Sequence, residues 1–227
     1  MSDQTPPIRI LHEDEHLVVV SKPPGMAVHR GDRSAEDEQF LLQTLHAQLD
    51  RYVYPVHRLD RPTSGLVAFA LTKSAAADLQ RSLRAATKRY LVLARGSTAE
   101  RFVCERPLRD ERDEPQPART SFEKLAELSR CSLLWALLDT GRTHQIRRHL
   151  AHCAHHVIGD STHGKGRINR WFREHHGLPR LFLHAHRLEL AHPATNEPLS
   201  LDDPLPDDLR AFLLRLPDAD AELVARL

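Results

Sequence analysis

The apolar residues of this 227-residue chain come in short runs, and the two longest, 66–71 and 133–138, are six residues each. A run of that length fits a buried strand, whereas a membrane-spanning helix needs about 20 apolar residues. The pattern therefore predicts a sheet-based protein and excludes a transmembrane helix. The first residues show no basic segment followed by an apolar run, so we expect no secretory signal.

Alternation of apolar and polar residues predicts strands, and apolar spacing of three to four predicts helices. The predicted strands are 8–12 and 16–20 (a hairpin), 52–56, 66–71, 90–94, 102–105, 119–128, 131–139, 181–190 and 198–201. The predicted helices are 36–49, a segment capped by Thr72 or Ser74 and ending near Ala86, 143–154, 169–176 and 206–214. Proline, glycine and charge predict loops at 21–25, 57–65 and 109–117, the last fully exposed.

These elements predict an α+β fold, a mixed and mostly antiparallel sheet with flanking helices. The sequence contains no repeat and no long linker, so we expect a single domain over 1–227, with its core at 8–201 and an acidic region at 202–227. Three widely spaced cysteines form neither a disulfide framework nor a CxxC metal motif, which favours a reduced, cytoplasmic protein.

The formal net charge of +1 conceals an uneven distribution. Residues 142–187 contain nine Lys and Arg against two acids, together with ten of the sixteen histidines, whereas residues 197–227 contain eight acids against three arginines. A second run, 81–95, has five basic residues and no acid. Local patches decide polyanion binding, so charge alone leaves nucleic-acid binding and ordinary solvated helix faces equally open.

The most unusual segment is the loop 57–66, which holds a histidine, two arginines, a carboxylate and two hydroxyls between two predicted strands. Loops presented by rigid strands commonly carry catalytic groups. Pro62 and Gly65 restrict and turn the backbone, so that Asp60 can be held in one pose. By residue type alone, an ordinary turn in which Asp60 bonds backbone amides is the favoured interpretation.

Two further segments are candidates. Arg142, Arg147 and Arg148 stand at the start of the helix predicted over 143–154, where positive charge opposes the helix dipole and suggests an anionic partner. In and just after the same helix, His149, His152, Cys153 and His156 have helical spacing that permits a zinc site. No carboxylate suited to a catalytic zinc site accompanies them, so surface histidines in a basic patch are the favoured interpretation.

Together these segments resemble the RluA family of pseudouridine synthases over about residues 8–201. The matching segments are VVSKPPGMAVH at 19–29, HRLDRPTSGL at 57–66, KRY at 88–90, TGRTHQIRRHL at 140–150 and LHAHRL at 183–188. We expect no counterpart of the S4-like RNA-binding domain that several rRNA-directed relatives carry. The resemblance implies isomerisation of an RNA uridine to pseudouridine and makes Asp60 the reacting carboxylate. The best match is to family members that act on uridine 65 of tRNA.

The resemblance also implies roles for other residues. Arg147 is expected to pair with Asp60, Tyr90 to pack on the uracil ring, and Arg58 to fill the gap left by a flipped base. The remaining expected substrate contacts are His29, Lys22, His57, Arg142 and Ile146, of which Lys22 and His29 are expected at phosphates. The reaction implied needs no cofactor or metal, and we expect a monomeric, cytoplasmic enzyme with tRNA as its partner and no membrane attachment.

Three alternatives remain at this level. The first is a pseudouridine synthase of the same family that acts on an rRNA uridine or on another tRNA uridine. The second is a non-catalytic RNA-binding module, in which Asp60 has no chemical role. The third is a zinc hydrolase whose metal is bound by His149, His152 and Cys153. Whether Asp60 attacks C1′, adds to the base or removes the C2′ proton is left open by the sequence.

Overall fold

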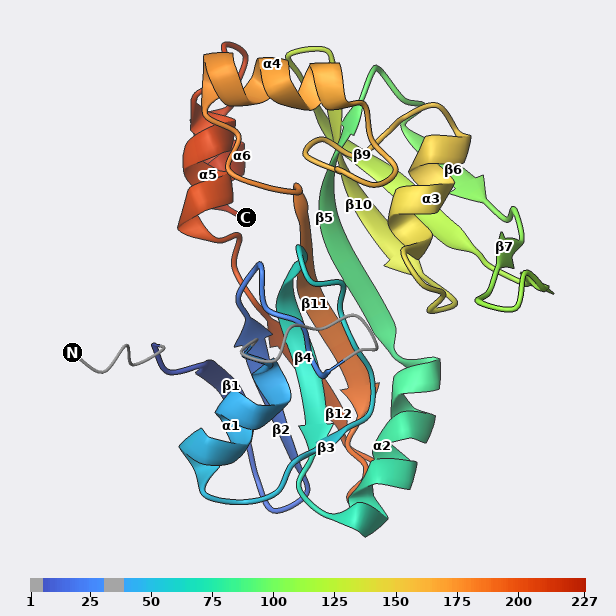
Figure 1. Ribbon diagram of the computed structural model, residues 1–227, viewed down its shortest axis with the longest axis vertical. Coiled ribbons are helices and arrows are strands. Elements are labelled where there is room, and N and C mark those ends of the chain that lie inside the picture. Colours follow the sequence, from blue (N-terminus) through green and yellow to red (C-terminus); the bar gives the residue numbers. More distant parts are fainter. Residues whose placement is uncertain (1–5, 31–38) are drawn as a thin grey trace. The chain divides into compact units, whose positions relative to one another are not determined.

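The computed structural model describes residues 6–30 and 39–227 of the chain. Contacts divide the chain into two compact units, drawn together in Figure 1. Unit 1 consists of Met1–Ala86 and Arg187–Asp203, and unit 2 consists of Thr87–His186 and Pro204–Leu227. The sequence predicts a single catalytic domain over 1–227. The contacts define each unit separately and do not test this prediction.

Unit 1 is an antiparallel sheet with two helices. Its elements are β1 (Arg9–Glu13), β2 (Leu17–Lys22), α1 (Leu41–Leu49), β3 (Tyr54–Pro55), β4 (Ser64–Ala70), α2 (Lys73–Ala85) and β12 (Pro198–Asp202). Strand β2 lies between β1 and β4, and β3 pairs with β4. Strand β11 (Leu183–Ala191) is divided between the units, and its second half, from Arg187, pairs with β12. The predicted hairpin of β1 and β2 is confirmed.

The core of unit 1 explains two of the sequence patterns. Every residue of β4 is buried, which is why the run 66–71 is continuously apolar instead of alternating. Helix α2 places its apolar stripe, Ala75, Leu79 and Leu83, in the cluster that contains Leu66 and Ala68. The side chain of Thr72 accepts a hydrogen bond from the Ala75 N–H, so Thr72 is the N-cap, one of the two caps predicted.

Unit 2 is built on four antiparallel strands in the order β5, β10, β9, β6. Its elements are β5 (Thr87–Arg95), β6 (Arg101–Cys104), β7 (Leu108–Arg109), β8 (Pro115–Gln116), β9 (Thr120–Leu128), β10 (Cys131–Leu138), α3 (Gln145–His152), α4 (Gly166–His176), the first half of β11, α5 (Asp207–Leu214) and α6 (Ala221–Ala225). A hydrophobic core cluster of this unit contains Leu91, Leu133, Phe172, Phe182 and Phe212.

The antiparallel pairing and the helices confirm the predicted α+β class. No helix among the described residues has the length and apolar character needed to cross a bilayer. Several elements differ from the sequence prediction in their presence or bounds. The predicted loop 109–117 contains the small hairpin β7–β8, helix α6 was not predicted, and the first helix begins at Leu41 while residues 36–38 lie outside the described residues.

Helix α3 also begins later than predicted, at Gln145 instead of Thr143. The residue before it, His144, has a left-handed backbone with φ of 55° and no side-chain cap. The amide oxygen of Gln145 accepts bonds from the Arg142 N–H and the Thr140 hydroxyl and so orders the segment before the helix. The first residue of the helix, Gln145, therefore orders the backbone that precedes it. A search for Ser or Thr at the N-cap position does not detect this arrangement.

Gly159 has a left-handed backbone with φ of +84°, and an added Cβ would lie 2.2 Å from the Arg180 carbonyl oxygen. We expect Gly159→Ala to lower the free energy of unfolding by at least about 2 kcal/mol, because backbone strain and the steric clash add. Gly166→Ala is the matched control, since nothing lies within 4 Å of its added Cβ, and it should change stability by less than about 1 kcal/mol. Equal urea midpoints for the two variants would contradict this account.

Candidate active site

A fully buried lysine organises the loop that carries Asp60. Lys22 is the last residue of β2 and pairs with Gly65 of β4, at the point where the loop 57–63 joins that strand. Its side chain is 0 % exposed, and its ammonium donates to the carbonyl oxygens of Pro23 at 2.7 Å, Met26 at 2.8 Å and Arg61 at 3.2 Å. Lys22 thus connects two loops that are 39 residues apart in sequence.

The same two loops are joined again by reciprocal bonds between Gly25 and Arg61. The Gly25 N–H donates to the Arg61 carbonyl at 2.8 Å, and the Arg61 Nε donates back to the Gly25 carbonyl at 2.9 Å. The Thr63 N–H donates to the Asp60 carbonyl at 3.0 Å and closes a turn over Asp60–Thr63. Asp60 is half-buried at the start of this turn, and Arg61, the residue after it, is held by Lys22 and Gly25.

His57 also has a structural partner. Its Nε2 accepts a hydrogen bond of 2.9 Å from the Ala68 N–H of β4. Strand β3 pairs with β4 only through Tyr54 and Pro55, so the His57 ring satisfies a β4 amide just beyond the end of that ladder. The Nε2 atom is therefore an acceptor bound within unit 1, and the substrate contact predicted for His57 stays a prediction.

The phosphate contact predicted for Lys22 stays a prediction, and the structure places its ammonium in the interior, where it donates to three carbonyl oxygens. A phosphate contact requires a side chain that reaches solvent. His29 and Arg58, by contrast, are exposed on unit 1. They remain predicted substrate contacts.

The other predicted site residues belong to unit 2. Tyr90 is a buried residue of β5 and pairs with Ala136 of β10. Ile146 is buried in the first turn of α3. Arg142 is exposed before α3, and its Nε donates to the Pro117 carbonyl at 3.0 Å. These residues are on a different unit from Asp60, so their grouping around one substrate stays a prediction.

Arg147 forms a buried, bidentate ion pair with Asp160. Its side chain is 3 % exposed, and Nε and Nη2 lie 2.8 and 2.9 Å from the two carboxylate oxygens. Burial raises the pKa of Asp160, but the Arg147 guanidinium and the N–H groups of His163 and Thr162 outweigh it and hold that pKa below its ordinary value. A buried guanidinium held in this way does not serve as a surface phosphate contact.

The sequence patterns do not single out Asp160, although one signal is present. It is one of only two acids in the basic stretch 142–187. Its carboxylate also accepts from the N–H groups of Thr162 and His163, and Asn169 donates to its carbonyl oxygen. Asp160 therefore ties α3 and the start of α4 to the segment that follows Ile158. Its pairing with Arg147 does not test the predicted pairing of Arg147 with Asp60.

The histidine cluster considered as a zinc site has another role in the structure. His149 is fully buried in α3, its Nε2 bonds the Arg106 carbonyl at 3.0 Å, and its Nδ1 bonds the Thr120 hydroxyl at 2.9 Å. Burial lowers the pKa of His149. Both ring nitrogens are engaged within the protein, so His149 does not offer a lone pair to a metal.

Among the residues that the structure describes, one group has the donor spacing of a metal site: His12, Asp14 and His192. Both histidine Nε2 atoms lie within 2.9 Å of the same oxygen of Asp14. The Nδ1 of His192 accepts from the Ala194 and Thr195 N–H groups, which places its proton on Nε2. A metal would need the lone pair of that Nε2, so these three residues form a hydrogen-bonded cluster instead.

The sequence that contains the Asp60 loop and the buried strands on either side of it matches a known enzyme family. The family model for RNA pseudouridylate synthase matches residues 16–152, which contain both the Asp60 loop and Arg147. The chain belongs to this family of RNA pseudouridine synthases, which are isomerases, and the resemblance found in the sequence is confirmed.

Individual relatives extend the match over most of the chain. The chain is 39 % identical to tRNA pseudouridine synthase C of Vibrio cholerae over 216 residues, which cover 85 % of this chain and 88 % of that one. It is 39 % identical to tRNA pseudouridine synthase C of Yersinia pestis over 218 residues, covering 86 % and 85 %. The solved human RNA pseudouridylate synthase domain containing 4 is 25 % identical, with a TM-score of 0.74, and covers 93 % of this chain and 95 % of its own.

The Lys22 contacts predict a large cost when its charge is removed. Lys22→Met leaves the Pro23, Met26 and Arg61 carbonyls without their donor, so the free energy of unfolding should fall by about 2–4 kcal/mol. The control is Lys73→Met at the exposed start of α2, which should stay within about 0.5 kcal/mol. Urea unfolding of both variants measures the difference, and equal stability would refute the structural role of Lys22.

The Arg147–Asp160 pair predicts a specific pH dependence. Since folding lowers the Asp160 pKa, its contribution to stability is complete above the unfolded value of about 3.9 and is lost as pH falls through the lower folded value. Asp160→Asn should lose about 3–5 kcal/mol at neutral pH. It should also show a shallower decline in stability below about pH 4 than the wild type.

Asp78→Asn provides the comparison, because Asp78 pairs with Arg81 on an exposed helix surface. An exposed pair contributes about 0–1 kcal/mol, so this variant should follow the wild-type stability curve at every pH. Urea unfolding at pH 7, 5 and 3 measures all three proteins. An unchanged acid slope in Asp160→Asn would remove Asp160 from the groups that set the acid stability.

Proposed function

We propose that this protein isomerises uridine 65 of tRNA to pseudouridine, with Asp60 as the reacting carboxylate. The observation that carries the proposal is the 39 % identity, over 85 % of the chain, to a protein named tRNA pseudouridine synthase C. The enzyme class follows from the family, whereas the RNA and the uridine are the proposed part. We further propose that the enzyme works in the cytoplasm as a monomer and without a cofactor or metal.

The chemistry requires little beyond a positioned carboxylate. The bond between ribose C1′ and uracil N1 breaks, the base turns, and a bond forms between C1′ and C5. C5 gives up a proton and N1 gains one, so atoms and electrons balance without a redox partner. Asp60 lies in a turn whose backbone is held by the Thr63 N–H, by the bonds between Arg61 and Gly25, and by the Lys22 ammonium. A rigid turn suits a carboxylate that must contact one particular atom of the substrate.

The roles proposed for the other residues agree with where each one lies. Tyr90 stands on a central strand of unit 2, where a rigid ring suits packing on uracil. Arg147, held by Asp160, is suited to a fixed electrostatic role and would lower the pKa of a carboxylate placed next to it. Arg58, His29 and Arg142 are exposed, as contacts with an RNA backbone or a flipped-base gap require.

The proposed function predicts that Asp60→Asn abolishes isomerisation while the protein still folds and binds RNA. The amide keeps the shape of the side chain but cannot act as a base or nucleophile, so the single-turnover rate should fall by more than about a hundredfold. Tritium release from tRNA labelled at uridine C5 measures the rate, and a filter assay measures RNA binding. A rate within tenfold of wild type would remove Asp60 from the reaction.

Asp113→Asn is the matched control, because Asp113 is an exposed aspartate with φ of 63° in the β7–β8 loop, a conformation that asparagine also adopts. A tRNA transcript with cytidine at position 65 tests the finer proposal and should release no tritium. Release from that transcript, or from rRNA fragments alone, would keep the enzyme class and overturn the assignment to uridine 65. Binding without any release from wild type would favour the non-catalytic RNA-binding module.

A further inference from the structure

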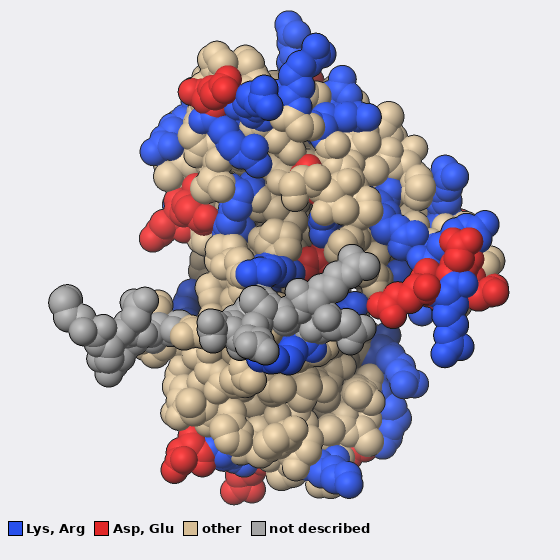
Figure 2. Space-filling model, viewed as in Figure 1, with Lys and Arg blue, Asp and Glu red and all other residues tan. Residues whose placement is uncertain are grey.

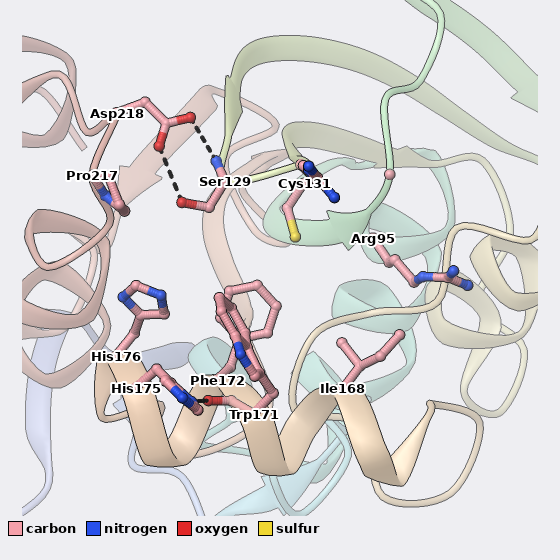
Figure 3. Close-up of a pocket in the computed structure, with 12 residues that line it drawn as sticks. Arg95, Ser129, Cys131, Ile168, Trp171, Phe172, His175, His176, Pro217 and Asp218 are labelled. Carbon is pink, nitrogen blue, oxygen red and sulfur yellow. Dashed lines mark hydrogen bonds between the residues drawn. The ribbon is translucent and has the colours of Figure 1, made fainter.

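Unit 2 contains a pocket that the proposed active site does not use. It lies between α4, the turn that joins β9 to β10, and Pro217 and Asp218 of the C-terminal segment. Its cavity volume of 1110 Å³ slightly exceeds the usual range for ligand pockets, about 300–1,000 Å³. Figure 3 shows Trp171 and Phe172 pointing from α4 into this cavity, with Ser129 and Cys131 on the facing wall.

Trp171 is the exceptional residue of the pocket. Its neighbour Phe172 is buried in the unit 2 core and packs against Phe212. Trp171 lies outside that core cluster, and its ring meets the Phe172 ring edge-on at 5.0 Å. Trp171 is 44 % exposed, and its ring stacks on that of His175 with centroids 5.0 Å apart and planes at 20°. A large, pre-oriented aromatic ring that the fold does not need for its core is suited to binding.

The surroundings of Trp171 are strongly basic. The exposed face of α4 and its N-cap carry Lys165, Arg167, Arg170 and Arg173 against one acid, Glu174. Figure 2 shows Lys and Arg side chains gathered over this helix. Two more exposed arginines, Arg95 and Arg130, line the opposite side of the pocket. The charge is therefore complementary to a polyanion.

The turn that presents Arg130 is strained. Ser129 and Arg130 both have left-handed backbones, with φ of 49° and 61°, in a two-residue hairpin turn that normally takes Asn-Gly. The carboxylate of Asp218 holds the turn by accepting from the Ser129 N–H at 2.8 Å and from its hydroxyl at 3.1 Å. The one acid of the pocket is thus already bound, and Arg130 is held at the pocket rim.

We propose that this pocket binds an unpaired nucleotide of the RNA, with the base stacked on Trp171 and the neighbouring phosphates contacted by Arg95, Arg130 and the arginines of α4. An aromatic ring among arginines is the arrangement with which proteins bind single-stranded nucleic acid. A paired base is already stacked on its neighbours, so the nucleotide must come from a loop, an end or an unpaired site. The inference rests on RNA as the substrate, and it adds a second contact region on unit 2.

The test uses fluorescence, because the chain has only two tryptophans. In a Trp135→Phe background, Trp171 alone reports binding of a single-stranded oligouridylate. We expect the oligonucleotide to quench this fluorescence. The anisotropy of a labelled oligonucleotide measures its affinity for variants of the wild-type chain. Trp171→Ala should weaken this affinity about tenfold, because one stacked base is lost. Trp171→Phe should keep most of the affinity, because an aromatic ring remains.

Heparin separates base stacking from charge, because it is a polyanion without bases. Trp171→Ala should bind heparin as the wild type does, whereas Arg170→Ala should weaken both ligands and lower the log–log salt slope for RNA by about one unit. Tyr52→Ala is the control for an exposed aromatic, being 57 % exposed on unit 1, and should bind the oligonucleotide normally.

Three results would overturn the proposal: normal oligonucleotide binding by Trp171→Ala, an equal loss of heparin binding by that variant, or an unquenched Trp171 at saturating oligonucleotide. The absence of quenching is the result expected if the pocket binds a protein partner instead of a nucleotide. None of these measurements needs turnover. An inactive wild type would therefore refute the proposed function while leaving the binding result readable, and failed stacking would leave the Asp60 test unaffected.

Discussion

The loop that carries Asp60 in unit 1 depends on one buried cation, Lys22. Lys22 ends β2, and its ammonium holds the carbonyls of Pro23, Met26 and Arg61, so the strand that it ends and the loop that carries Asp60 share one rigid connection. A buried ammonium is tolerated only when its donors are satisfied, and this requirement in turn fixes where those carbonyls must lie. Gly25, Arg61 and Thr63 then complete the frame around Asp60 through backbone bonds. Because the strand and loop ends are fixed, a short exposed segment can present a carboxylate in one position without being buried itself.

Unit 2 uses a second buried charge in the same way. Arg147 and Asp160 satisfy each other with two short bonds, and Asp160 also collects the N–H groups of Thr162 and His163. The pair connects α3 with the segment leading to α4. The two arginines that flank it, Arg142 and Arg148, bond carbonyl oxygens at the surface instead. Three arginines that look equivalent in the sequence therefore have different environments, and only the buried one has a carboxylate partner among the described contacts of unit 2.

Asp60 and the basic side chains of α4 belong to different units. The carboxylate expected to react lies on unit 1, whereas the basic side chains of α4 and the pocket beside Trp171 lie on unit 2. Isomerisation requires one precise carboxylate, but holding an RNA requires many weak contacts spread over a surface. The charges of this near-neutral chain are unevenly distributed, since residues 197–227 contain eight acids against three arginines. Within the pocket, Asp218 is occupied by Ser129, so the cavity presents arginines, histidines and an aromatic ring to solvent.

The sequence by itself determined what depends on neighbouring residues: the strand and helix periods, the Thr72 cap, the α+β class and the family motifs that identify Asp60. These signals are local, because side-chain direction repeats every two residues in a strand and every 3.6 in a helix. Only the tertiary structure decided which charges are buried and with whom. Lys22 meets Arg61 across 39 residues, and Arg147 meets Asp160 across 13. Burial and pairing depend on how distant segments fold together, so the same residue types serve as a phosphate contact at the surface and as a structural ion in the core. For that reason the sequence did not show that Lys22 is buried, or that Trp171 is exposed beside the buried Phe172.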